Sequence, residues 1–243
     1  MPVYVFNTFN DPSAFAGTTD AAGVNDKDQI VGFVQGFVNG VSGVHGFLLS
    51  EGAYTSIDDP SATLGTEAFG INNSGQIVGA YANASGTHGF LYDPTSNMFP
   101  PYFTLNDPLA TGPEGTTASG INASGEIVGY YQDASLRHHG FLLSGGAYTT
   151  LDDPSAAGGD TFAEGINSSG QIVGSYSNAT GIHGFVYNPS NGSYTTVDDP
   201  LAGGGTLPFG INDLGQIVGF FINASALMRS SIAVAHSPPP TTP

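Results

Sequence analysis

The ten residues GINNSGQIVG, at positions 70–79, return along the chain at a nearly constant spacing. Close copies are GINASGEIVG at 120–129, GINSSGQIVG at 165–174 and GINDLGQIVG at 210–219, and a more divergent copy, GVNDKDQIVG, lies at 23–32. A second phrase, HGF followed by mostly apolar residues, begins at His45, His88, His139 and His183. Because self-similarity at a fixed period marks a repeat architecture, we interpret the chain as a series of repeated units.

Each unit also carries a third phrase, a β-branched or aromatic segment that ends in Asp-Pro. The phrase closes at Pro60, Pro108, Pro154 and Pro200, and the N-terminal NTFNDP, which ends at Pro12, is a fifth copy. The aspartate before each proline lies at positions 11, 59, 107, 153 and 199, so the repeat is 46 to 48 residues long. Five such units account for nearly all of the 243 residues.

Four short segments in each unit are typical of β-strands. They are the lead-in to GIN, the phrase QIVGxY, the phrase HGFLL and the segment YTTLDD, which is rich in β-branched and aromatic residues. The Asn-x-x-Gly between the first two predicts a short hairpin turn with a positive φ angle at its last position. That position holds Gly75, Gly125, Gly170 and Gly215, and the first unit has Asp28 there.

Four strands that repeat about every 40–50 residues are typical of a β-propeller blade. The sequence therefore predicts an all-β fold, a five-bladed β-propeller of four-stranded antiparallel blades, over residues 1–236, followed by a Pro/Thr-rich tail or linker at 237–243. Residues 4–10 match a fourth strand and residues 231–235 a third strand, so we expect the N-terminal strand to complete the last blade and close the ring. The alternative is an open β-solenoid, which would need capping repeats at both ends.

The phrases GIN-x-x-GQIVG and HGFL resemble the HAF-type extracellular repeat of bacteria, named for a His-Ala-Phe phrase. The resemblance spans all five units, although Gly46, Gly89, Gly140 and Gly184 stand where that phrase has alanine. It implies a repeat architecture and an exported or cell-surface bacterial protein, and it implies no activity. Residues 1–6 do not look like a signal peptide, so we expect any leader to be absent from this sequence.

The composition excludes several kinds of partner. The formal net charge is −17 and the only basic side chains are Lys27, Arg137 and Arg229, so no basic patch can bind nucleic acid or an anionic membrane surface. No apolar run approaches the ~20 residues that span a bilayer, so we expect no membrane insertion. The absence of cysteine excludes disulfides and thiolate metal sites. Carbohydrates, cations and basic peptides remain as partners, and the oligomeric state is left open.

The repeated Asp-Asp-Pro has two interpretations. Carboxylates bind calcium, which is the one cofactor that the sequence leaves open. Alternatively, the aspartates terminate strands, because aspartate caps turns through its side chain and proline cannot continue a ladder. Since no D-x-D-x-D-G spacing is present, we favour strand termination, and we favour a structural hydrogen-bonding role for the four HGF histidines. The calcium candidates are Asp58, Asp59, Asp152, Asp153, Asp198 and Asp199.

Positions where the repeats disagree are candidates for ligand contacts. The residue before Gly-Ile/Val-Asn is Ala22, Phe69, Ser119, Glu164 or Phe209. Two places earlier lie Asp20, Glu67, Thr117, Phe162 and Leu207. If the first strand of each unit lines the channel, these residues form an asymmetric wall with three carboxylates. Paired carboxylates suit glycoside hydrolysis, so Glu164, Glu67 and Asp20 are the catalytic candidates under that hypothesis.

A second candidate site lies where the loop between strands two and three meets the crossover to the next blade. The loop at 133–138 departs most from the other copies, because it has an inserted residue, Arg137 and an additional histidine, His138. We expect both residues to approach the acidic crossover at 152–160, since variable loops on a rigid scaffold often carry recognition. The predicted binding residues are Arg137, His138, Asp153, Asp160, Asn83 and Asn178.

Three functions follow from these patterns. The favoured one is a non-catalytic extracellular recognition or scaffold module that binds carbohydrate, because near-identical repeats offer several equivalent weak sites. The second is a structural cell-surface protein that forms filaments. The third is a glycoside hydrolase or lyase that uses the channel carboxylates, although no nucleophile motif such as G-x-S-x-G accompanies them. The sequence thus leaves catalysis open and favours binding.

Overall fold

The computed structural model describes residues 10–38, 40–222 and 228–231. Within these ranges the chain is all-β apart from one turn of 3-10 helix at Pro154–Ala156, and no helix in them is long and apolar enough to cross a membrane. The strands are β1 (Ala14–Val24), β2 (Ile30–Val38), β3 (Val41–Ser50), β4 (Ala53–Ser56), β5 (Gly65–Ile71), β6 (Ile77–Asn83), β7 (Gly86–Tyr92), β8 (Tyr102–Leu105), β9 (Thr116–Ile121), β10 (Ile127–Gln132), β11 (His138–Ser144), β12 (Ala147–Leu151), β13 (Thr161–Ile166), β14 (Ile172–Asn178), β15 (Gly181–Asn188), β16 (Ser193–Thr196), β17 (Gly205–Ile211), β18 (Ile217–Ile222) and β19 (Met228–Ser231).

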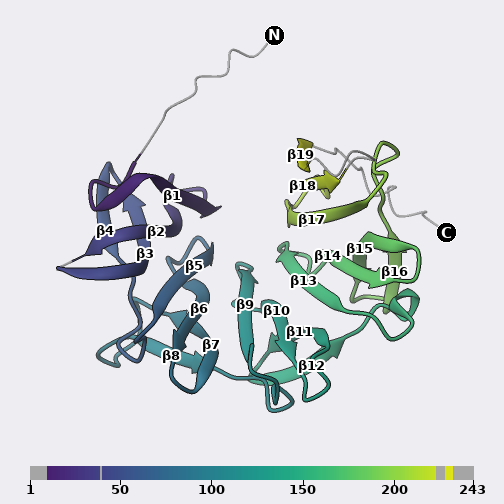
Figure 1. Cartoon of the computed structure of the whole chain (residues 1–243), viewed down its shortest axis with the longest axis horizontal. Coiled ribbons are helices and arrows are strands. Elements are labelled where there is room, and N and C mark those ends of the chain that lie inside the picture. Colours follow the sequence, from purple (N-terminus) through teal and green to yellow (C-terminus); the bar gives the residue numbers. More distant parts are fainter. Residues whose placement is uncertain (1–9, 39, 223–227, 232–243) are drawn as a thin grey trace, which may run out of the picture.

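Consecutive strands form antiparallel groups that follow the sequence repeat. β1–β4, β5–β8, β9–β12 and β13–β16 contain four strands each, and β17–β19 come after them. Figure 1 shows these groups around a common centre, with the first strand of each group towards the centre and the fourth at the periphery. The first strands contact their neighbours in the order β1, β5, β9, β13, β17. The inner wall of the arrangement is therefore built from the segments that lead into GIN.

The core of each of the first four groups is the phenylalanine of its HGF phrase. Phe47, Phe90, Phe141 and Phe185 are at most 1% exposed, and each lies on a third strand opposite the glycine of QIVG. Burial of a phenylalanine side chain stabilises the fold by roughly 1.5–3 kcal/mol. The glycine of each HGF phrase lies close to the fourth strand: a Cβ atom on Gly89 would come within 2.8 Å of the Leu105 carbonyl oxygen. The backbone at the end of the fourth strand thus approaches this glycine too closely for a side chain.

The turn between the first and second strands has the predicted conformation. The φ angles are 81° at Gly75, 78° at Gly125, 79° at Gly170 and 73° at Gly215, and Asp28 has 57°. The asparagine of GIN holds the turn, since Oδ1 of Asn72 accepts hydrogen bonds from the main-chain N–H groups of Ser74 (3.0 Å) and Gln76 (3.1 Å).

The same asparagines also join neighbouring groups. The Nδ2 atom of each donates to the main-chain oxygen of the equivalent asparagine in the next group. The four bonds run from Asn25 to Asn72 (3.0 Å), from Asn72 to Asn122 (3.1 Å), from Asn122 to Asn167 (3.2 Å) and from Asn167 to Asn212 (3.2 Å). One side chain per group thus fixes both the local turn and the position of the next group.

The third strand of the last group begins three residues earlier than the sequence predicts. β19 starts at Met228 rather than at Ser231. Its register pairs Phe221 with Arg229, as Tyr81 pairs with His88 in the second group, so Arg229 takes the backbone position of the HGF histidine. The prediction missed this because the last unit lacks the HGF phrase. Residues 4–9 of the predicted closing strand and residues 232–235 lie outside the described residues.

Replacing Gly170 with valine should lower the free energy of unfolding by roughly 1–3 kcal/mol, because a β-branched residue is strained at positive φ. Gly170→Asn is the matched variant, since asparagine enters this region more readily and should cost clearly less. Urea unfolding of the three proteins measures both effects. Equal stability of the wild type and the valine variant would contradict this role of the turn.

Candidate functional site

A central cavity of about 1010 Å³ opens among the first strands of the groups. The described residues that line it are Asp20, Ala21, Ala22, Phe33, Phe69, Thr117, Ser119, Tyr130, Glu164, Phe209, Val218, Gly219 and Phe220. They include all five residues that precede Gly-Ile/Val-Asn. The wall is asymmetric, since these five positions hold one carboxylate, one hydroxyl, two aromatic rings and one methyl group.

A β-bulge in every first strand aims these five side chains at the cavity. In β5 the register shifts between Ala68 and Gly70, and in β13 it shifts between Ala163 and Gly165, so that Phe69 and Glu164 have no direct partner on the next strand. The equivalent shifts in β1, β9 and β17 leave out Ala22, Ser119 and Phe209. A bulge inserts one residue into the alternation of the strand and redirects its side chain. The cavity wall therefore contains one bulge residue from each group.

Aromatic side chains from the second strands complete the wall. Phe33, Tyr130 and Phe220 follow the glycine of QIVG in β2, β10 and β18. Phe33 packs edge-on against Phe69 with ring centroids 6.1 Å apart, and Phe220 packs edge-on against Phe209 at 5.4 Å. Sequence reasoning missed these residues, although the repeats disagree at this position too: the other two groups have alanine and serine there.

Glu164 has the most perturbed carboxyl group of the cavity. Desolvation raises the pKa of Glu164 to about 7, and a hydrogen bond with Ser119 offsets part of the increase. As a whole residue Glu164 is partly exposed, and it lines the cavity. Near neutral pH the carboxyl group therefore exists as a mixture of acid and carboxylate.

The two other carboxylates predicted for the wall are placed differently. Asp20 lines the cavity and is exposed. Glu67 is half-buried, and desolvation raises its pKa, but it does not line the cavity. Of the three catalytic candidates, the structure thus brings Glu164 and Asp20 to one cavity.

The HGF histidines form a repeated hydrogen-bonded pair with the first residue of the Asp-Asp-Pro phrase. Nδ1 lies 2.9 Å from Asp58 at His45, 2.9 Å from Asp152 at His139 and 2.8 Å from Asp198 at His183, and at His88 it lies 3.0 Å from Asn106. Each pair ties the start of a third strand to the crossover that leads to the next group.

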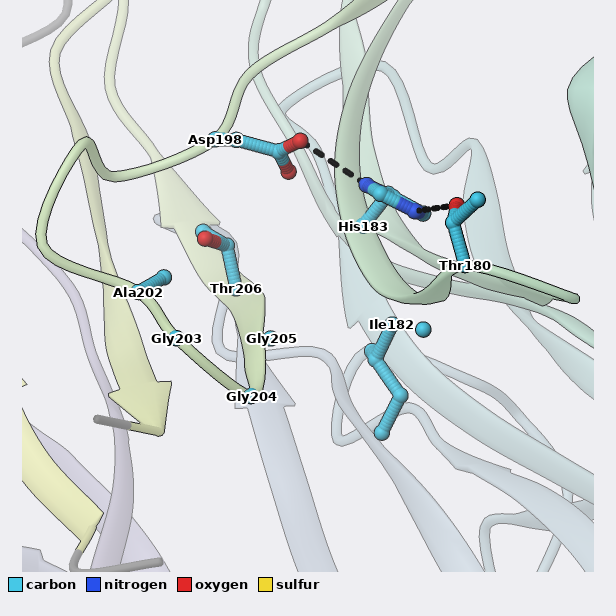
Figure 2. Close-up of a pocket in the computed structure, with 10 residues that line it drawn as sticks. Thr180, Ile182, His183, Asp198, Ala202, Gly203, Gly204, Gly205 and Thr206 are labelled. Carbon is cyan, nitrogen blue, oxygen red and sulfur yellow. Dashed lines mark hydrogen bonds and ion pairs between the residues drawn. The ribbon is translucent and has the colours of Figure 1, made fainter. Parts of the chain in front are cut away.

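Figure 2 shows the pair of the fourth group at a small pocket of about 100 Å³. His183 lies between Asp198 and Thr180, with its Nε2 atom 2.8 Å from the threonine Oγ1. The facing side is the stretch from Ala202 to Thr206, which includes three glycines. Space of this size accommodates a few water molecules, so the arrangement fits a structural role better than it fits a ligand site.

The second aspartate of each phrase terminates a strand. Asp153 is the clearest case: it is 3% exposed, its Oδ1 atom accepts from Ser155 N–H at 2.7 Å, and its own N–H donates to Thr161 at 3.2 Å. Asp59 makes the same two bonds with Ser61 and Thr66. Within the described residues, no group of three or more acidic or histidine side chains is placed so that it could hold a metal ion.

The residues of the predicted surface site lie in two places. Arg137 donates to the Gly159 carbonyl oxygen at 2.7 Å, and His138 donates its main-chain N–H to Asp160 at 2.8 Å, so both lie at the crossover between the third and fourth groups. The Nε2 atom of His138 is 2.8 Å from Glu114. These polar groups are therefore largely engaged within the chain.

Asn178 approaches the same crossover from the fourth group, with its Nδ2 atom donating to the Ser155 carbonyl oxygen at 3.1 Å. Asp153 shares Ser155 with Asn178, because its Oδ1 atom accepts from the Ser155 N–H. Asn83 makes the equivalent contact with Ser61, at 3.4 Å, one crossover away. Arg137, His138 and Asp160 thus form one cluster, Asp153 and Asn178 lie along the same crossover, and Asn83 lies in another group.

No family model and no curated protein matches the chain. Several solved structures are similar to the chain. A mutant of the Aleuria aurantia lectin AAL in complex with Fucα1-6GlcNAc is 14% identical, with a TM-score of 0.50 over 86% of this chain and 72% of that chain. AofleA from Arthrobotrys oligospora is 10% identical, with a TM-score of 0.50 over 88% of this chain and 71% of that one. These likenesses show a β-propeller-like all-β fold. The resemblance to HAF-type repeats stays a prediction.

The raised pKa of Glu164 predicts a pH-dependent stability. The folded chain retains a proton that the unfolded chain, with its ordinary pKa of 4.5, releases, so this contribution to stability is present at low pH and is lost as the pH rises through about 7. The isosteric variant Glu164→Gln should therefore become more stable relative to wild type, by up to about 3 kcal/mol, between about pH 4 and pH 8. Urea unfolding across this range measures the difference. A constant difference would contradict the raised pKa.

Proposed function

We propose that the chain is a non-catalytic carbohydrate-recognition module that binds a glycan in the central cavity. The observation that carries the proposal is the wall of bulge residues, which sets aromatic rings beside hydroxyl and carboxyl groups. Rings present apolar faces to the C–H face of a sugar, while Ser119, Thr117 and Glu164 can exchange hydrogen bonds with its hydroxyl groups. Mostly apolar walls with a few placed polar groups are typical of ligand pockets.

The lectin-like fold and the predicted location support this proposal. A structure with this fold contains a bound fucoside, which makes a glycan a reasonable first ligand to test. The resemblance to HAF-type repeats favours an extracellular or cell-surface position, where glycans are accessible. We propose that location for this chain as well.

Binding is tested by screening the protein on a glycan array and measuring the affinity of the hits by calorimetry. Phe209→Ala should weaken binding by roughly tenfold or more, because it removes one of the rings that face the ligand. Phe15→Ala is the matched control, since Phe15 is 41% exposed against 43% for Phe209, and each packs edge-on against one other phenylalanine. The control should bind as the wild type does.

Two outcomes would contradict this function. An equal loss of glycan affinity in Phe209→Ala and Phe15→Ala would show that the ligand does not bind at the cavity wall. The absence of any hit on an array of plant, fungal and bacterial glycans would favour the structural, filament-forming alternative, for which electron microscopy of the concentrated protein is the direct test.

Glycoside hydrolysis is a second candidate, because Glu164 with a pKa of about 7 suits a general acid and Asp20 lines the same cavity. Release of reducing ends from a glycan that binds, lost in Glu164→Gln, would favour hydrolysis over recognition alone. Binding without any release of reducing ends would favour the recognition module.

We also propose that the five groups are blades of a closed propeller and that the N-terminal strand supplies the missing fourth strand of the last one. The motivation for closure is the repeat itself: asparagine bonds join each group to the next from Asn25 to Asn212, and closure would require a fifth, from Asn212 to the main-chain oxygen of Asn25. Closure would also leave neither β1 nor β17 at an unpartnered edge of the ring.

Deletion of residues 1–9 should lower the midpoint of thermal unfolding by several degrees, because it would leave the edge of the last group unpaired. Differential scanning calorimetry of both proteins measures the change. Removal of residues 237–243, which are assigned to a tail, is the control and should leave the midpoint unchanged. If the N-terminal deletion melts with the wild type, this proposal for ring closure is wrong.

A further inference from the structure

The described part of the cavity wall has an unusual charge distribution. Two carboxyl groups, those of Asp20 and Glu164, lie in it, and none of the lining residues is lysine, arginine or histidine. The whole chain carries a formal net charge of −17. An acidic ligand would meet this negative potential without any basic partner, whereas a basic ligand would be attracted to it. The wall thus selects against uronic acids and sialic acids.

Among the residues that the structure describes, no ion pair is formed by Glu164. Its hydrogen-bond partner is the Ser119 hydroxyl. Burial raises the pKa of the nearby phenol of Tyr130, and the charge of Glu164 raises it further, as do those of Glu114 and Glu67. Burial penalises the carboxylate form, and only one hydrogen bond stabilises it. A ligand ammonium at this point would form a charge-assisted hydrogen bond, which is roughly twice as strong as a neutral one.

The aromatic rings of the wall favour the same kind of ligand. Phe33, Phe69, Tyr130, Phe209 and Phe220 contribute rings to a cavity that is open enough to admit a sugar. The faces of such rings attract cations, and this attraction increases when the cation is desolvated. The rings would therefore act together with the carboxylates towards one ligand that combines a sugar body with a positive charge.

We propose that the cavity recognises amino sugars, that is, 2-amino-2-deoxy sugars with a free protonated amine, and that Glu164 pairs with that amine. This specificity rests on the proposed carbohydrate-recognition function. Glucosamine oligosaccharides are the simplest members of the class. Their N-acetylated and 2-hydroxyl counterparts share the same ring and linkage but lack the charge.

The test compares three dimers or trimers that differ only at C2: glucosamine, N-acetylglucosamine and glucose oligomers with the same β-1,4 linkage. Calorimetry with the wild type, near neutral pH where both the ammonium form of the sugar and the carboxylate form of Glu164 are populated, should give an affinity for the glucosamine oligomer about tenfold above that for the other two. In Glu164→Gln this preference should disappear, so that the ratio of the affinity for the glucosamine oligomer to that for the neutral oligomers falls to about one. Short oligomers limit the non-specific attraction of a polycation to an acidic protein.

Glu51→Gln is the matched control, since it changes the net charge by the same amount at an exposed turn outside the cavity. It should retain the full preference. If it loses the preference as Glu164→Gln does, long-range charge and not Glu164 is responsible, and the proposed pairing is wrong. Asp20→Asn provides a second cavity variant should Glu164→Gln fail to fold, and it should reduce the preference.

The outcomes separate the two proposals. Equal affinity for all three oligomers would overturn the preference for amino sugars and leave carbohydrate recognition standing. Tighter binding of the N-acetylated oligomer would also overturn the preference, because it would assign the C2 contact to the aromatic rings alone. No binding of these oligomers, together with hits for other glycans on the array, would exclude amino sugars only. No binding of any glycan would overturn both proposals.

Discussion

The structure depends on the close packing of a main-chain carbonyl group against a glycine. In the second group, a Cβ atom on Gly79 would overlap the carbonyl oxygen of Glu67, and it would come within 2.7 Å of the Phe90 ring. The glycine of QIVG meets the same two obstacles in the groups of Phe141 and Phe185. Because the first strand approaches so closely here, the buried phenylalanine fits beneath the glycine and the bulge forms directly beyond it. The core, the bulge and the direction of the wall residue are thus linked.

A second set of contacts determines how the groups are placed relative to one another. The asparagine of GIN satisfies its own turn through Oδ1 and reaches the next group through Nδ2, so a single side chain fixes the position of the next group. At the opposite end of the strands, the histidine–aspartate pairs join third strands to crossovers. Polar contacts between groups therefore lie at both ends of the strands, and the apolar core lies between them.

Much of this arrangement could be predicted from the sequence, because repetition averages out the ambiguity of any single segment. Five copies of Asn-x-x-Gly or its variant identify the positive φ position, and disagreement among the copies identifies the first-strand residues of the wall. The bulge could not be predicted, since it depends on a tertiary overlap at glycine and leaves no separate motif. Phe33, Tyr130 and Phe220 could not be assigned to the wall, because regular alternation alone does not indicate that the second strand also faces the cavity at this position. The third strand of the last group was misplaced because Arg229 replaces the histidine that marks it elsewhere.

The bulges have a consequence for how such a protein can change. A side chain that leaves the regular alternation of its strand contributes little to the buried core of its own group, so its replacement alters the cavity wall and spares the hydrophobic layer behind it. Ala22, Phe69, Ser119, Glu164 and Phe209 illustrate this tolerance, since methyl, aromatic, hydroxyl and carboxyl side chains occupy one and the same backbone position. The strands thus form a constant scaffold for five variable side chains. A different ligand preference would require only substitutions at these bulge positions.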